Sequence, residues 1–98
     1  MRKTSLDIDE IVEIKQLFIK AGLEIDDIHY MIAEEGEPIE YQVMVITFSG
    51  DKDKMEKFEQ RQLEEFKKQH QMDIGVEYIC GSINKEIYKY TYEFWKYF

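Results

Sequence analysis

The sequence predicts a single α+β domain in which two helices cover one face of a mainly antiparallel four-stranded sheet, in the order αββαββ. Two segments repeat apolar residues at helical spacing, and four others alternate them or are rich in β-branched and aromatic residues. A length of 98 residues suits one domain, and 44% hydrophobic residues are enough for one core. We therefore expect residues 1–98 to fold as one unit.

The first helix is expected over about Asp9–Ala21. Asp7 or Asp9 can cap its start, because a short carboxylate accepts hydrogen bonds from the first free backbone N–H groups. Gly22 stands where a left-handed residue ends a helix. Its apolar side chains recur at the spacing of one helical face: Ile11, Ile14, Phe18 and Ala21.

Two β-rich arms follow at Ile25–Ala33 and Ile39–Phe48, and the connection between them contains Gly and Pro. Apolar residues alternate along both arms, as they do in a half-buried strand. The two arms are therefore predicted to form a hairpin. The second arm is apolar on both faces from Val43 to Phe48, which indicates an interior strand.

A second helix is expected over about Asp53–Gln69, where Asp53 and Glu56 fit an acidic version of the capping box. The rest of this segment is mostly charged, so the helix should lie on the surface with one side against the sheet. A third strand is predicted over Ile74–Cys80, where apolar residues alternate. The apolar stripe of the helix consists of Met55, Phe58, Leu63 and Phe66.

The last segment, Ile83–Phe98, fits two interpretations. Aromatic residues at every second position favour a strand over about Glu86–Trp95. Charged residues within about 100° of a helical circumference favour a helix instead. We prefer the strand on propensity, and a weak internal repeat of the order helix–strand–strand agrees with it.

Acidic residues concentrate in the first half of the chain. Between Asp7 and Glu40 there are eleven acidic and two basic side chains, a net charge of −9, whereas the whole chain carries −8. A field of one sign repels nucleic acid and anionic membranes and attracts basic surfaces. The predicted contact set for a basic protein partner consists of the acids in a stretch without Lys or Arg: Glu24, Asp26, Asp27, Glu34, Glu35, Glu37 and Glu40.

Aromatic residues concentrate at the other end, where they make up seven of the last eleven residues. Two helices leave the second face of a sheet rich in Tyr, Ile and Val uncovered, and Tyr and Trp are common at protein interfaces. An oligomer contact, such as that of a homodimer, is therefore an alternative to burial in the core. Its predicted residues are Tyr88, Tyr90, Tyr92 and Trp95.

No catalytic constellation is recognisable in the sequence. Cys80 with His70 or His29 is the one nucleophile–base pair available, and Cys80 lies in an apolar strand, where a packed thiol is the commoner role. Glycine-rich phosphate loops and dinucleotide fingerprints are absent as well, so we expect neither an enzyme nor a cofactor. A small-ligand module or enzyme that uses Cys80, His70 and Tyr78 is the weakest alternative.

Metal binding is not expected either. Asp51-Lys52-Asp53 begins like a calcium loop, but its sixth and twelfth positions lack the required Gly and Glu. Asp26, Asp27 and His29 have the chemistry of metal ligands. Strand alternation, however, predicts that Asp26 points away from the other two.

The single cysteine excludes an intramolecular disulfide and fits a reducing compartment, so we expect a cytoplasmic protein. No apolar run reaches the ~18 residues of a membrane span. The leading hypothesis is a non-catalytic interaction or regulatory protein whose acidic surface binds a basic protein. In one version it is an inhibitor that mimics nucleic-acid charge, because same-side residues of a strand recur at a spacing comparable with that of DNA phosphates. The alternative is a homo-oligomeric subunit that pairs through the aromatic strand and is acidic only for solubility.

Overall fold

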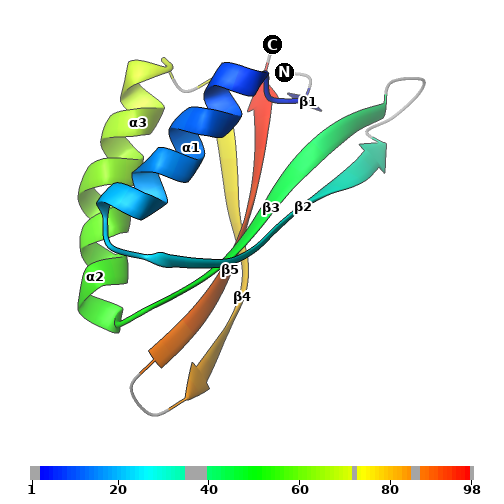
Figure 1. Ribbon diagram of the computed structural model, residues 1–98. Coiled ribbons are helices and arrows are strands. Elements are labelled where there is room, and N and C mark those ends of the chain that lie inside the picture. The colour runs from blue at the N-terminus through cyan, green and yellow to red at the C-terminus, as the bar shows by residue number, and fades with distance from the viewer. Residues whose placement is uncertain (1–2, 35–39, 72, 85–86, 98) are drawn as a thin grey trace.

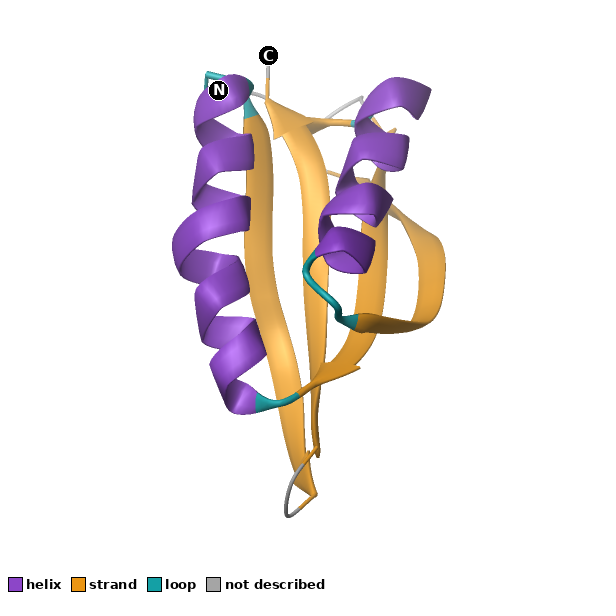
Figure 2. Ribbon diagram, turned by 60° about the vertical axis from the view of Figure 1, so that its left-hand side comes forward, coloured by secondary structure: helices purple, strands orange, loops and turns teal. Residues whose placement is uncertain are grey.

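Two helical segments pack side by side on one face of a five-stranded antiparallel sheet in the computed structural model (Figures 1 and 2). The structure describes residues 3–34, 40–71, 73–84 and 87–97, and only the backbone at residues 34, 79–84 and 87–88. None of the described helices combines the length and apolar character needed to cross a membrane. The elements are β1 (Lys3–Thr4), α1 (Ile8–Lys20), β2 (Glu24–Glu34), β3 (Glu40–Gly50), a helical segment from Lys52 to Gln69, β4 (Ile74–Asn84) and β5 (Ile87–Tyr97).

The predicted fold class is confirmed, with two differences. The last element, β5, is a strand, so the helical interpretation of residues 83–98 is wrong. The sheet has a fifth strand, because Lys3 and Thr4 pair with Tyr97 and Lys96. Two residues are too few to show an alternation in the sequence, which is why β1 was not predicted.

The sheet is built around the pairing of β3 with β5. Ile46 lies opposite Tyr92 at the middle of this pairing, and the hairpin partners β2 and β4 form the two edges. The prediction that β3 is an interior strand is therefore confirmed. The short β1 continues along β5 beyond the last residue that β5 shares with β3.

The main core lies between this sheet and the helices. Alternate residues of β3 and β5 point toward the helices, and the rings of Phe48 and Tyr92 stack with centroids 5.6 Å apart. Phe18 of α1 reaches the same group, 4.7 Å from both Phe48 and Phe58. Of the eight apolar residues predicted on the inner faces of the two helices, five are buried, and Ile11, Ala21 and Met55 pack against them with part of their surface exposed. The five are Ile14, Phe18, Phe58, Leu63 and Phe66.

The capping signals of α1 are confirmed, and those of the second helix are corrected. Asp7 accepts a hydrogen bond from the N–H of Glu10, and Glu10 accepts one from the N–H of Asp7, which completes a capping box. Gly22 follows the helix with a φ of 75°, a left-handed value that favours glycine. In the second helix Asp51, and not Asp53, is the capping residue.

The second helical segment contains a π-helical turn. It consists of α2 (Lys52–Lys57), the π-helix η1 (Phe58–Leu63) and α3 (Glu64–Gln69). At 3.6 residues per turn, Phe58 and Leu63 would lie about 140° apart around the axis. In a π turn the backbone hydrogen bonds join residues five apart, and the wider turn brings the two side chains closer to the same face. Both are buried as a result.

A second, smaller core lies on the face without helices. Trp95 packs there directly on Gly75, because a Cβ at residue 75 would come within 2.1 Å of the indole Nε1. The ammonium group of Lys3 lies 4.5 Å from the centre of the indole ring. The buried members of this second core are Tyr41, Val43, Val45 and Trp95.

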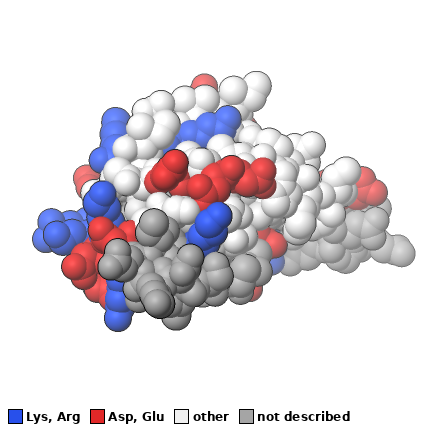
Figure 3. Space-filling model, turned by 60° about the horizontal axis from the view of Figure 1, so that its bottom comes forward, with Lys and Arg blue, Asp and Glu red and all other residues white. Residues whose placement is uncertain are grey.

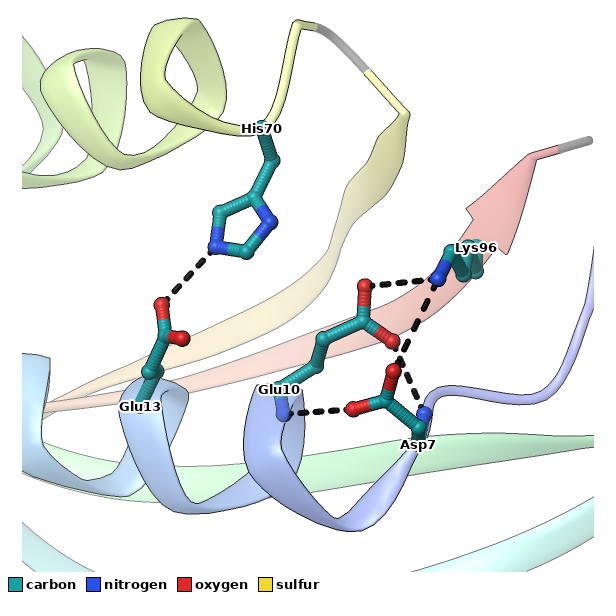
Figure 4. A network of polar contacts seen from close by, with 5 residues as sticks. All are labelled: Asp7, Glu10, Glu13, His70 and Lys96. Atoms are coloured by element: carbon teal, nitrogen blue, oxygen red, sulfur yellow. Dashed lines mark hydrogen bonds and ion pairs between the residues drawn. The ribbon is translucent and has the colours of Figure 1, made fainter.

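A polar network joins α1 to β5 and to α3 (Figure 4). Glu10 is only 5% exposed, and its carboxylate lies 3.1 Å from the ammonium group of Lys96. The hydrogen bond to Glu10 raises the pKa of Lys96 above its usual value. On the neighbouring flank of α1, Glu13 and His70 are joined by a 2.8 Å contact. Acids of the first helix therefore contribute to the fold itself.

Replacing Lys96 by Met should lower the free energy of unfolding by about 1–3 kcal/mol, because it leaves the buried carboxylate of Glu10 without its cation. Urea unfolding at pH 7 measures this change. Lys52→Met is the control, since the ammonium group of Lys52 lies 4.0 Å from Glu56 in an exposed pair. It should cost less than about 0.5 kcal/mol. Equal losses in the two variants would contradict the role given to Lys96.

The capping box predicts a dependence of stability on pH. The backbone hydrogen bond from Glu10 holds the pKa of Asp7 below its usual value. Such a group stabilises the fold above its unfolded pKa, and this stabilisation is lost as the pH falls through the folded pKa. Asp7→Asn should therefore be less stable than the wild type at pH 7, and the difference should shrink below about pH 4. Unfolding free energies measured from pH 7 to 3 that differ by a constant amount would rule this out.

Gly75→Ala should destabilise the second core by about 1–3 kcal/mol, because the added methyl group displaces the indole ring of Trp95. Trp95 is the single tryptophan of the chain, so its fluorescence reports on the site directly. We expect a shifted emission maximum together with a lower unfolding midpoint. Unchanged emission and stability would mean that the contact between Gly75 and Trp95 is looser than the structure indicates.

Candidate protein-binding surface

A β-bulge near the start of β2 gathers acidic side chains on the face of the sheet without helices. Ile25 pairs with Phe48 and Asp27 pairs with Thr47, so Asp26 is an extra residue between them. The carboxylate of Asp26 accepts a hydrogen bond from the hydroxyl of Ser49, which lies on the same face as Thr47. The prediction that Asp26 points away from Asp27 is therefore wrong, because it assumed a regular strand.

Five acids lie on this face, and we call them the acidic face. Glu24 pairs with Ser49 and so lies on the same side as Asp26. Across the sheet, Glu77 of β4 and Glu93 of β5 lie on this side too, because Glu93 pairs with the second-core residue Val45. The acidic face consists of Glu24, Asp26, Asp27, Glu77 and Glu93, of which Glu93 alone is partly buried.

Few internal cations balance the acidic face. Lys89 approaches Asp26 to 3.8 Å, and His29 forms a 2.7 Å contact with Asp27. Glu77 and Glu93 lie directly opposite each other on neighbouring strands, and no described Lys or Arg forms an ion pair with either. Like charges in this position are destabilising, by an amount on the order of 0.2–1 kcal/mol. A cation supplied from outside would relieve that repulsion.

Hydroxyl groups lie between the acids. Thr47 of β3 and Thr91 of β5 form a hydrogen bond 3.1 Å long across the central strand pair. Beyond them along the strands, the second core around Trp95 occupies the remainder of the face. The face is thus divided into a polar, acidic half and an apolar half. In Figure 3, acidic side chains form a row on the side shown, with basic side chains on either side of the row.

The seven residues predicted to contact a basic partner are only partly brought together. Glu24, Asp26 and Asp27 are exposed and lie on the acidic face, while Glu40 is exposed at the far end of the hairpin. The backbone of Glu34 pairs with that of Glu40, but the side chain of Glu34 lies outside the described part. Glu35 and Glu37 also lie outside the described residues.

The aromatic residues predicted to form an oligomer contact divide between the two cores. Tyr90 and Tyr92 are buried with the helices, and Trp95 is buried in the second core. The side chain of Tyr88 is not among those described. Packing within one chain accounts for the three described aromatic residues, so an oligomer contact through them stays a prediction that the burial does not require.

The residues considered for catalysis lie apart. The backbone of Cys80 is in β4 and His29 is in β2, so β5 and β3 lie between them. Neighbouring strands are about 4.8 Å apart, which separates the two backbones by about 14 Å. His70 is held by Glu13 at the end of the helical segment. Within the described part of the chain, no three His, Cys, Asp or Glu side chains form a group that could hold a metal ion.

Sequence reasoning missed Glu77 and Glu93 as part of the candidate surface. They belong to the second half of the chain, which is close to neutral overall, so no local excess of charge surrounds them in the sequence. Only the pairing of β4 with β5 and of β5 with β3 brings them onto the face that carries Asp27. The one available signal was that each acid alternates with apolar residues along its strand. This alternation does not specify which strands are adjacent in the sheet.

Comparison with known proteins places this surface in no established family. No protein-family model matches the chain, and no curated protein sequence matches it.

Proposed function

We propose that this chain is a non-catalytic, cytoplasmic interaction protein whose acidic face binds a basic surface of another protein. The observation that carries the proposal is the bulge at Asp26, which turns Asp26 and Asp27 toward the same face of the sheet. Bulges in sheets often re-aim side chains in this way near functional sites. Glu24 extends the same row along β2.

Electrostatics supports a cationic partner. The chain carries a net charge of −8, and the pair of Glu77 and Glu93 places two like charges opposite each other. A Lys or Arg from a partner would interact with both carboxylates at once, and a bidentate Arg would suit either of them. Long-range attraction of this kind raises the association rate and weakens as salt is added.

The same face has room for a partner. No helix of the described residues covers it, since α1 and the second helical segment pack on the opposite side of the sheet (Figure 2). The hydroxyl groups of Ser49, Thr47 and Thr91 add hydrogen-bonding groups between the acids. Charge at the acidic face would then determine the orientation of the partner.

Mimicry of nucleic-acid charge is the narrower form of this proposal. Acids on one side of a strand are separated by about 6.6–6.8 Å, and acids on neighbouring strands by about 4.8 Å. An array of this kind offers a DNA- or RNA-binding protein a rigid substitute for phosphates. A nucleic-acid oligonucleotide should then compete with this protein for the same partner.

The test compares two variants with the same change in charge. Glu24→Gln, Asp26→Asn and Asp27→Asn together neutralise the β2 part of the acidic face. Asp53→Asn, Glu56→Gln and Glu65→Gln together neutralise three acids of the second helical segment and serve as the control. Basic proteins retained by the wild-type chain at low salt and released at high salt are identified, and their affinity for each variant is measured by calorimetry.

We expect the β2 variant to lose at least about tenfold in affinity, because three contacts to charged groups are weakened together. The control variant should lose less than about threefold, an effect of net charge alone. Equal losses in the two variants would show that overall acidity, and not the acidic face, attracts the partner. Retention of no basic protein at low salt would refute the proposal.

A further inference from the structure

The edge strand β2 has the features of a docking site for an extended segment of the partner. We propose that a basic segment of the partner pairs with the outer edge of β2 as an additional antiparallel strand, with apolar side chains toward the helix side of the sheet and Lys or Arg side chains toward the acidic face. This inference rests on the proposed function, because it gives the binding mode of the same basic partner. It assigns a second surface, the backbone of β2, to that interaction.

The outer edge of β2 is long, and its protection is confined to its first residues. Among the described strands, β2 pairs with β3 alone over 11 residues, so its outer backbone groups face away from the sheet. Proteins usually shield such an edge with charged side chains, proline, a bulge or a covering element. The bulge and three acids lie within Glu24–Asp27, whereas the stretch from Ile28 to Ala33 contains no Lys, Arg, Asp, Glu or Pro.

Large apolar side chains on β2 remain exposed beyond the bulge. Tyr30, Met31 and Ile32 are 44%, 43% and 70% exposed. Tyr30 pairs with the core residue Met44, and Ile32 pairs with Gln42 two residues along, so both lie on the helix side of the sheet. Three consecutive exposed apolar residues on an open edge are typical of an interaction surface and not of a solvated strand.

The first helix carries further exposed apolar side chains. Ile8, Val12 and Ile19 are at least half exposed and recur at intervals of four and seven residues, which places them in one row along α1. Glu13, which contacts His70 of α3, lies about 100° around the helix from Val12. The row therefore lies outside the contact between α1 and the second helical segment, and α1 covers the side of the sheet toward which Tyr30 and Ile32 point.

The two sides of an added strand would meet different chemistry. Successive side chains of a strand point to opposite faces. On the helix side they would meet Tyr30 and Ile32. On the opposite side they would meet Asp26 and Asp27. A segment in which Val or Ile alternates with Lys or Arg satisfies both sides, and its backbone supplies the hydrogen bonds that β2 lacks at its edge.

Charge favours a basic partner over a second copy of this chain. If two copies of β2 paired antiparallel about Tyr30, Ile28 would lie opposite Ile32, but Asp26 would lie opposite Glu34 at both ends. A parallel pairing would place each acid beside its own copy. Like charges on paired strands are destabilising, and each copy also carries a net charge of −8. A basic strand reverses the sign of these interactions.

The experiment uses the full chain and a short synthetic peptide in which Lys and Val alternate. We expect binding that depends on salt and slows hydrogen exchange at the amides of β2. The same peptide with N-methyl groups on alternate residues keeps its charge but cannot pair along one edge. It should bind at least about tenfold more weakly. An N-methylated peptide that binds as tightly as its parent would overturn the strand-addition mode.

Tyr30→Lys provides the matched test on the protein, because it places a protective lysine on the open edge. Tyr78→Lys is its control, since Tyr78 lies on the other edge strand, β4, with 48% of its surface exposed. Binding of the peptide should fall at least about tenfold in the first variant and less than about threefold in the second. Circular dichroism checks that both variants are folded. Equal effects at the two edges would refute the assignment to β2.

Failure of this inference can be distinguished from failure of the proposed function. If methylation has no effect while neutralising Glu24, Asp26 and Asp27 abolishes binding, the acidic face binds basic partners without strand addition. If neither peptide binds at low salt, both proposals fall. A stable dimer in sedimentation that Tyr30→Lys dissociates would show that a second copy occupies the edge, and would overturn the choice of a basic partner.

Discussion

The antiparallel pairing of β3 with β5 is the constraint on which the rest of the structure depends. Along both strands, successive side chains point to opposite faces of the sheet. Phe48 and Tyr92 therefore pack against the helices, while Val45 and Trp95 pack on the other face. Both faces of the two central strands are thereby buried, although helices cover only one. Part of the second face is shielded by its own side chains, because the glycine at residue 75 admits the indole ring of Trp95.

The acids of the chain fall into two groups: those with partners inside the fold and those exposed on the sheet. On α1, Asp7 and Glu10 cap the helix and contact Lys96, and Glu13 contacts His70, so three of the early acids already have partners. On the sheet, Asp27 and Glu77 come from different hairpins, and only the pairing of the central strands places them on the same face. The acidic stretch of the sequence therefore contains both acids that stabilise the fold and acids that are exposed on the sheet. Only the three-dimensional structure distinguishes the two groups.

Most of the fold follows from local pattern in the sequence. Helical spacing at Ile14 and Phe18, the cap at Asp7 and the glycine at residue 22 specify α1, and the two-sided apolar run of β3 indicates an interior strand. The π turn at Phe58–Leu63 is not predictable in this way, because it is fixed by how the helix packs on the sheet. The candidate surface was found in part: Asp26 and Asp27 were chosen for their charge. Their common orientation and the addition of Glu77 and Glu93 depend on a bulge and on strand order, which leave no local signature.

The bulge in β2 changes which residues of the strand, odd-numbered or even-numbered, face the helices. Before it, odd-numbered Ile25 packs toward the helices, and after it the even-numbered Ile28 does so. Removing Asp26 would restore regular alternation, because Ile25, Asp27 and Ile28 already lie opposite the consecutive residues Phe48, Thr47 and Ile46. Ile25 and Ile28 would both still face the helices. The core therefore does not require the extra residue, and the bulge adds one acid to the face without helices while leaving every core side chain of β2 in place.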